Sequence, residues 1–172
     1  MSVDFAFIDS GTGGLPYMCY LNEKCPSASC IYVADAQNFP YGEKSTDEIC
    51  TCVTQLCEKI ISRFSPKVIV LACNTMSVTA LSVLRSKFDV SFIGTVPAIK
   101  LASSITKNKK IGLLATRRSV SENYTLKLIK DFASDCQVFS RGDGELISFI
   151  EHNLTTATEN EKLIAVKPAV DF

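Results

Sequence analysis

The sequence predicts an α/β fold built on a parallel sheet. Short apolar runs of strand length alternate along the chain with segments whose apolar residues recur at helical spacing. The run Val68–Ala72 is apolar throughout, which is typical of a parallel strand buried on both faces. With Gly94–Pro97 as the expected hinge, the alternation indicates a Rossmann-like lobe over residues 1–95 and a second α/β lobe over residues 96–172. The same Gly and Pro could equally form one tight turn.

Four strands joined by helices are expected in the first lobe. The first strand leads through a glycine-rich turn into a helix over Leu15–Glu23. Ser45 and Glu48 stand at capping-box spacing and open an amphipathic helix that runs to Phe64, where Pro66 stops it. The expected strands are Val3–Asp9, Ile31–Asp35, Val68–Ala72 and Val90–Ile93, and a further helix passes through Ala80, Leu81 and Leu84.

The second lobe repeats the alternation with weaker signals. A strand is expected over Lys110–Thr116, and one continuous helix should follow it. A weaker strand at Gln137–Phe139 precedes a helix over Leu146–Ile150, and no further strand is expected in Glu159–Phe172. The continuous helix is expected to pass through Val120, Tyr124, Leu128 and Phe132.

The composition argues against several classes of protein. The 172 residues include 18 Lys and Arg and 18 Asp and Glu, which gives no net charge. Binding of a nucleic acid by neutralisation of its phosphates is therefore not expected. No apolar run reaches the length of a membrane span, which argues against a membrane partner. The first residues include Asp4 and no basic segment, so a secretory signal is not expected. We therefore expect a soluble cytoplasmic protein.

Eight cysteines raise the alternatives of metal binding and disulfides. No two of them form a Cys-x-x-Cys pair and there is one histidine, so a metal site has little support. Disulfides are not expected without an export signal. Cys52 and Cys57 lie on a helical apolar stripe and are interpreted as small buried hydrophobic residues. Of all eight, only Cys73 is expected to do chemistry, and the other seven are expected to be packing residues.

Polar residues follow several of the expected strands. Ligands of open parallel sheets collect at the carboxyl ends of the strands, so these residues are expected to form a site at one edge. They are Asp9, Ser10, Asp35, Cys73, Asn74, Thr75 and Thr116.

The glycine-rich turn Ser10–Gly14 does not indicate a nucleotide cofactor. It lacks the Gly-Lys-Ser/Thr of a phosphate-binding loop, and Pro16 stands where a dinucleotide fingerprint has its third glycine. The remaining interpretation is a tight turn from strand to helix whose glycines allow the backbone to approach its neighbours closely. Such a turn would suit the binding of a carboxylate at the helix N-terminus.

Cys73 differs from the other cysteines because it ends an apolar strand and is followed by Asn74 and Thr75, which are good helix-capping residues. The helix dipole would favour the thiolate, although a buried core cysteine is the alternative. The only histidine, His152, is not at a strand end and is expected to be exposed without a catalytic role. A thiol beside a carboxylate suits abstraction of a proton from carbon better than nucleophilic catalysis.

Four motifs, in this order, resemble the signature of bacterial glutamate racemases, members of the cofactor-independent aspartate/glutamate racemase superfamily. The resemblance extends from about residue 3 to about residue 150 and implies an Asp/Glu racemase-like fold. The motifs are Phe7–Leu15, Pro40–Ser45, Ala72–Thr75 and Ile111–Thr116.

The resemblance implies racemisation of glutamate by two cysteines on opposite faces of the substrate, without a cofactor, to provide D-glutamate for peptidoglycan. Cys73 matches the cysteine that takes the α-proton of D-glutamate, and Asp9 matches the carboxylate that assists it. Local fields that lower the pKa of a thiol make such chemistry accessible near neutral pH. The matched substrate-binding residues are Asp9, Ser10, Tyr41, Gly42, Asn74, Thr75 and Thr116. A homodimer is compatible with the resemblance.

Simpler interpretations of three residues stay open. Tyr41 could be a turn residue that packs its ring, and Thr116 could be only a helix cap. Asp35 could be a cap or a turn former and is not included among the residues implied to contact substrate.

The sequence departs from the family at the second cysteine, which lies in a downstream Gly-Cys-Thr-His motif. No Cys-Thr-His occurs here, and Cys136, which precedes a weak strand, is expected to be a core residue. The chain therefore resembles a racemase that lacks its last part, with an incomplete second lobe. Three hypotheses follow: a glutamate racemase represented by a fragment or a truncated or frameshifted product, an inactive remnant or carboxylate-binding protein, and a relative acting on another amino acid.

Overall fold

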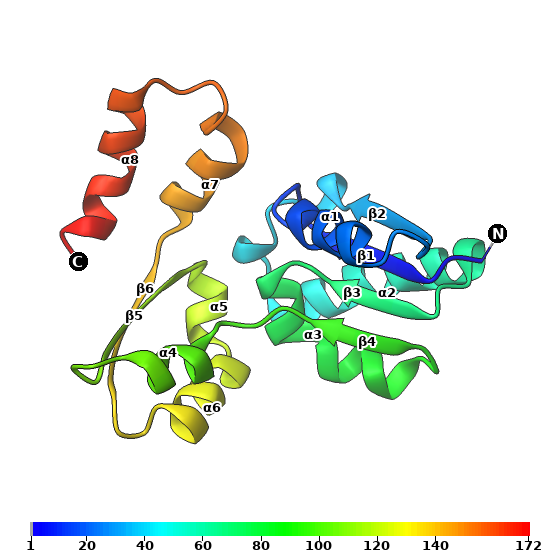
Figure 1. Ribbon diagram of the computed structural model, residues 1–172, viewed down its shortest axis with the longest axis horizontal. Coiled ribbons are helices and arrows are strands. Elements are labelled where there is room, and N and C mark those ends of the chain that lie inside the picture. Colours follow the sequence, from blue (N-terminus) through cyan, green and yellow to red (C-terminus); the bar gives the residue numbers. More distant parts are fainter. Residues whose placement is uncertain (1) are drawn as a thin grey trace. The chain divides into compact units, whose positions relative to one another are not determined.

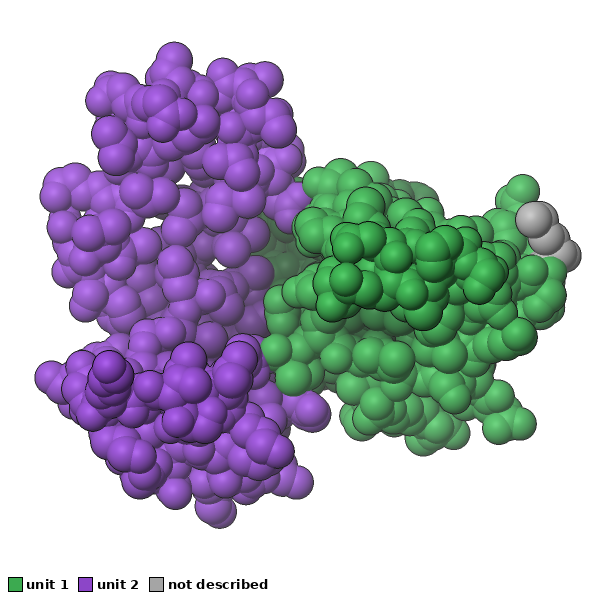
Figure 2. Space-filling view, in the orientation of Figure 1, with its two compact units in different colours: residues 1–96 green, residues 97–172 purple. Residues whose placement is uncertain are grey.

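The computed structural model describes residues 2–172. They form two compact units, residues 1–96 and residues 97–172, coloured green and purple in Figure 2. Both are α/β units with parallel strands, as the alternation of apolar runs predicts. No helix in the described part is long and apolar enough to cross a membrane.

The first unit is built on a four-stranded parallel sheet in the order β2-β1-β3-β4 (Figure 1). Its central strand β1 pairs with β2 on one side and with β3 on the other. The chain therefore moves to one side of β1 first and to the other side afterwards. Such a reversal opens a crevice at the carboxyl ends of the two strands that flank it, which here are β1 and β3. The strands are β1 (Phe5–Asp9), β2 (Cys30–Ala34), β3 (Val68–Leu71) and β4 (Ser91–Gly94).

Three α-helices and two short 3-10 helices connect these strands. The capping box predicted for the second α-helix is confirmed: the Ser45 amide donates to Glu48 Oε2 at 2.8 Å, and the Glu48 amide donates to Ser45 Oγ at 3.3 Å. That helix ends at Ser65, a non-glycine residue in the left-handed region at φ 40°. The helices are α1 (Leu15–Lys24), η1 (Ala36–Asn38), η2 (Tyr41–Glu43), α2 (Thr46–Phe64) and α3 (Asn74–Lys87).

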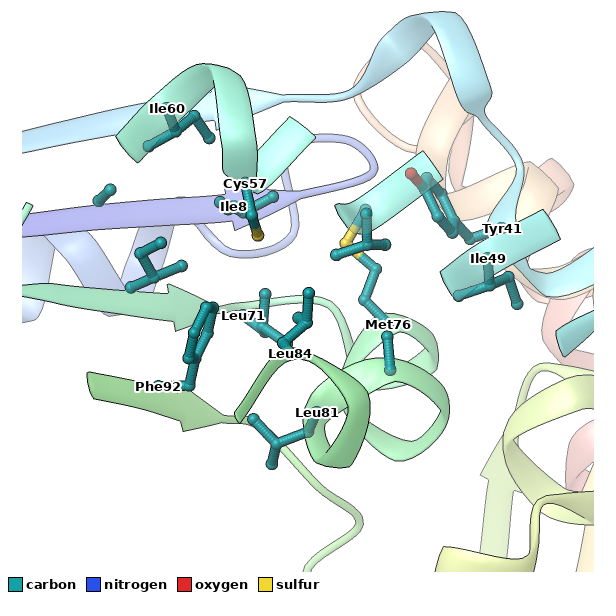
Figure 3. Packing of buried hydrophobic residues seen from close by; sticks show 14 residues of the cluster. Ile8, Tyr41, Ile49, Cys57, Ile60, Leu71, Met76, Leu81, Leu84 and Phe92 are labelled. Carbon is teal, nitrogen blue, oxygen red and sulfur yellow. The ribbon is translucent and has the colours of Figure 1, made fainter. Parts of the chain in front are cut away.

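The core of the first unit lies where α2 and α3 pack together and against the sheet (Figure 3). Helix α2 supplies buried residues at helical spacing, so one face of it is apolar. Burial of this apolar surface is the main favourable term that holds the sheet and its two helices together. The buried cluster includes Ile8, Ile49, Val53, Cys57, Ile60, Ile69, Leu71, Met76, Leu84 and Phe92.

The cysteines only partly follow the expectation that seven of them are packing residues. Cys57 is completely buried, as predicted, and its pKa rises to about 12 because burial disfavours the thiolate. Cys52 is only half-buried, and its thiol donates to Asn38 Oδ1 at 3.4 Å. Cys19 and Cys25 are exposed, so for them the packing interpretation was wrong. Cys19 lies on α1, which buries none of its residues, and Cys25 caps that helix. The described residues form no disulfide and no cluster of three potential metal ligands.

The second unit has a two-stranded parallel sheet, β5 (Lys110–Ala115) and β6 (Gln137–Gly142). Its apolar cluster is small: among the described residues it comprises Ile99, Ile111 and Ala133, with half-buried neighbours around them. The helices of this unit are α4 (Ile99–Ile105), α5 (Arg117–Ser121), α6 (Asn123–Phe132), α7 (Gly144–Asn153) and α8 (Glu159–Val170).

Two predictions for the second unit needed correction, and one helix was not predicted. The single helix expected after β5 is two helices, because Glu122 is extended (φ −67°, ψ 139°) and separates α5 from α6. Strand β6 continues to Gly142, beyond the short strand expected there. Helix α8 was not predicted, although Thr158 and Glu161 form a capping box that marks its start.

Candidate active site

The site is centred on Asp9, the last residue of β1, and Cys73, which caps α3 two residues after the neighbouring strand β3 ends. Because the two strands are paired and parallel, their carboxyl ends lie at the same edge of the sheet. Ser10 links the two residues: its Oγ is 3.7 Å from Cys73 Sγ and 3.4 Å from Asp9 Oδ1. A thiol, a hydroxyl and a carboxylate therefore meet at the crevice where the strand order reverses.

The Asp9 carboxylate is buried, and both of its oxygens accept hydrogen bonds. Oδ1 accepts from the Ser10 amide at 2.7 Å and from the Ser10 hydroxyl, whereas Oδ2 accepts from the Gly14 amide and from the Tyr32 hydroxyl at 3.1 Å. A buried carboxylate that accepts several hydrogen bonds is held in one orientation. Asp9 therefore presents a fixed negative group beside Cys73.

The glycine-rich turn makes the close backbone approach that its sequence predicts. A Cβ on Gly14 would lie 2.4 Å from Ala72 Cβ, so only glycine fits between the start of α1 and the end of β3. This approach also brings the Gly14 amide onto Asp9.

The environment of Cys73 corrects the expectation about its ionisation. Burial raises the pKa of the Cys73 thiol, and the Asp9 charge raises it further. The amides of Met76 and Thr75 and the Ser10 hydroxyl lower the pKa, but they do not reverse the shift. The start of α3 does favour the thiolate, as expected, yet desolvation outweighs it. The resting form of Cys73 is the neutral thiol.

Tyr41 and Asp35 form a buried pair beside this site. Tyr41 is completely buried and donates to Asp35 Oδ2 at 2.6 Å, while Asn38 donates to both oxygens of the same carboxylate. Burial, followed by this hydrogen bond and the Asp35 charge, raises the pKa of Tyr41 far above its usual value. The Asp35 amide donates to the Asp9 carbonyl at 2.8 Å, which joins the pair to the end of β1. Asp35 therefore anchors the Tyr41 hydroxyl.

The other candidates lie in different environments. Asn74 is exposed and Thr75 is buried, both in the first turn of α3, and Gly42 is half-buried in η2. Thr116 lies in the second unit, where its hydroxyl caps α5 by accepting from the Ser119 amide at 3.1 Å.

Neither His152 nor Cys136 ends a strand. His152 is exposed on α7, with Nδ1 2.9 Å from the Ser148 carbonyl. Cys136 is half-buried against the small apolar cluster and directly precedes β6. Burial, followed by the neighbouring Asp135, raises the pKa of its thiol.

Sequence reasoning missed Tyr32, whose hydroxyl reaches Asp9 from β2. Tyr32 lies between Ile31 and Val33 inside an apolar strand, and only the strand order shows that its side chain meets the end of β1. The signal available in the sequence was a polar-tipped aromatic residue within a strand, where a buried hydroxyl needs a partner.

No protein-family model matches the chain. Individual proteins do match it. It is 42% identical to a glutamate racemase of Treponema pallidum (strain Nichols) over 166 residues, which are 96% of this chain and 62% of that protein. It is 44% identical to a glutamate racemase of Proteus mirabilis over 147 residues, 85% of this chain and 51% of that protein. This chain is a homologue of the glutamate racemases. It spans about half to two thirds of the length of the curated glutamate racemases that it matches.

Solved glutamate racemases share its fold. The structure of the Escherichia coli glutamate racemase with L-glutamate and the activator UDP-MurNAc-Ala is 35% identical, with a TM-score of 0.87 over 99% of this chain and 65% of that one. The Francisella tularensis glutamate racemase, solved with D-glutamate, is 26% identical with a TM-score of 0.78, over 96% of this chain and 62% of that one. The Asp/Glu racemase-like fold predicted from the motifs is thereby confirmed.

Proposed function

We propose that this glutamate racemase homologue interconverts L- and D-glutamate by cofactor-independent, cysteine-based proton transfer at the α-carbon, and so provides D-glutamate for peptidoglycan. The observation that carries the proposal is the meeting of Cys73, Ser10 and Asp9 at the edge where β1 and β3 end. The homology to glutamate racemases supports the choice of substrate.

In the proposed reaction, Cys73 acts as the base for D-glutamate. Its thiolate takes the α-proton, the electron pair stays on the α-carbon and its carboxylate, and a group on the opposite face returns a proton. In the reverse direction the neutral Cys73 thiol donates its proton to the carbanion. The sequence holds no Cys-Thr-His for the second position.

Asp9 would couple binding of the substrate to ionisation of Cys73. The Asp9 charge raises the pKa of the thiol, and a substrate ammonium group placed on Asp9 would neutralise that charge. Binding would then remove one of the causes that keep the thiol protonated. Release of the thiol proton to water, which forms the base, would then be easier with the substrate bound than without it.

The other matched residues would hold the substrate. Asn74 and Thr75 lie in the first turn of α3, where helix amides and small polar side chains suit a carboxylate, and Ser10 lies beside them with its Oγ 3.7 Å from Cys73 Sγ. Gly42 and the Asp35-anchored Tyr41 would bound the same site. We include Thr116 in this set on the basis of its motif alone.

The proposal also covers the cellular compartment and the oligomeric state. A free catalytic thiol such as Cys73 persists most readily in a reducing compartment, which supports the cytoplasm. We infer that two copies associate, because helix α8 exposes the apolar side chains of Leu163, Ile164 and Val170. The net charge of zero means that two copies do not repel each other. Light scattering across a concentration series tests this assembly.

Hydrogen exchange at the α-carbon is the direct test of the function. D-glutamate is incubated with the protein in deuterated water, and loss of its α-proton signal is followed by NMR. Exchange should occur with the wild type and with Cys19→Ala, an exposed cysteine control, and should be lost with Cys73→Ala. Binding of D-glutamate without exchange would instead support the second candidate, a carboxylate-binding protein.

A further inference from the structure

Tyr32 makes two contacts at the site that no motif assigns to it. Tyr32 on β2 is paired with Phe7 on β1. Its hydroxyl oxygen lies 3.1 Å from Asp9 Oδ2 and 3.0 Å from the Gly11 carbonyl oxygen. A phenolic hydroxyl has one proton to donate, so these two acceptors share it. The side chain thus ties the end of β1 to the turn that follows.

The Gly14 amide completes this arrangement from the other side of the turn. It donates to the same Asp9 oxygen, and a Cβ on Gly14 would lie 3.0 Å from that oxygen and 3.1 Å from the Tyr32 hydroxyl. The carboxylate, the hydroxyl and the turn backbone are therefore in mutual contact. None of the three can shift without displacing the others.

We propose that Tyr32 is a positioning residue that holds the Asp9 carboxylate and the Gly11–Gly14 turn in the geometry that receives the substrate ammonium group. The inference rests on the proposed function for its consequence, although the positioning itself is a property of the free protein. Without the hydroxyl, Asp9 Oδ2 keeps only the Gly14 amide, and the Gly11 carbonyl loses the tie to β2. The carboxylate still accepts from Ser10 on Oδ1, but Oδ2 and the turn are held less firmly.

Tyr32→Phe removes the hydroxyl and keeps the ring. Tyr20→Phe is the matched control, because it makes the same chemical change in the same unit at an exposed residue of α1. The first measurement is amide hydrogen exchange at Gly14, read by NMR without any ligand. We expect exchange about tenfold faster in Tyr32→Phe and unchanged in Tyr20→Phe, since a hydrogen bond to a charged group is typically worth at least one factor of ten.

The second measurement is the protection of Cys73 from iodoacetamide by D-glutamate, followed by mass spectrometry. We expect about tenfold more D-glutamate to be needed with Tyr32→Phe than with the wild type or Tyr20→Phe. For exchange of the α-proton, the Michaelis constant should rise by about the same factor with a smaller change in kcat, because Tyr32 acts on binding through Asp9.

The results separate this inference from the proposed function. Unchanged exchange at Gly14 in Tyr32→Phe overturns the positioning role, whether or not the protein binds glutamate. Faster exchange at Gly14 with unchanged protection by D-glutamate also overturns it, because the turn would then be irrelevant to the site. If D-glutamate protects no variant, including the wild type, the proposed substrate fails while the Gly14 result still decides whether Tyr32 holds Asp9.

Discussion

The hydroxyl oxygen of Ser10 and the thiol sulfur of Cys73 lie 3.7 Å apart, although 63 positions separate the two residues in the sequence. The contact exists because β1 and β3 are neighbours in the sheet while β2 lies on the far side of β1. Ser10 also touches Asp9, so a change at the carboxylate is transmitted to the thiol both by its charge and through this hydroxyl.

Asp9→Asn should lower the pKa of Cys73. The Asp9 charge is one of the causes that raise the thiol pKa, so its removal stabilises the thiolate. The midpoint of the pH profile of Cys73 alkylation by iodoacetamide should move to lower pH, while exchange of the α-proton of D-glutamate falls. Asp89→Asn, at an exposed residue, should leave the profile in place. A midpoint that stays or rises would show that Asp9 does not act on the thiol.

Assayed alone, the 172 residues supply the proton transfer on one face only of the proposed reaction, so they should exchange the α-proton of D-glutamate without turning it into L-glutamate. Cys73 can remove and return a proton on one face, and the sequence has no Cys-Thr-His to act on the other. Chiral chromatography of the NMR samples measures conversion. Conversion of both enantiomers that survives Cys136→Ala would be evidence against the need for a second thiol.

Gly14→Ala should destabilise the first unit by about 1–3 kcal/mol. The new Cβ would lie 2.4 Å from Ala72 Cβ, and this neighbour belongs to a short side chain that cannot swing away. Gly144→Ala is the control, because no atom lies within 4 Å of the added Cβ at the start of α7, and it should be neutral or slightly stabilising. Urea denaturation compares the two variants, and equal stability would contradict the close approach.

The second unit should open more readily than the first. Its buried cluster comprises only Ile99, Ile111 and Ala133, whereas the first unit packs α2 and α3 over a four-stranded sheet. Protection of a backbone amide reflects the cost of opening its surroundings, which rises with buried apolar contacts. Hydrogen exchange with mass spectrometry should show faster exchange in β5 and β6 than in β1 and β3. Equal protection in the two sheets would refute this order of stability.

Much of the fold could be predicted from local patterns. Apolar runs located the strands, and the capping pair Ser45 and Glu48 located the start of α2, because these signals act within a few residues. Weaker local signals failed in the second unit. The helical spacing of apolar residues continues across Glu122, where the chain is extended, and the capping pair Thr158 and Glu161 was overlooked.

The sequence alone determined which residues stand at strand ends, since Asp9, Cys73 and their polar followers occupy those positions whatever the order of the strands. The tertiary structure decided which of these residues meet. The strand order β2-β1-β3 brings Ser10 onto Cys73 and directs Tyr32 to Asp9. The tertiary structure also decided that the pKa of Cys73 is raised. The effect of the helix dipole is local and can be predicted from the sequence, whereas desolvation depends on everything packed around the thiol.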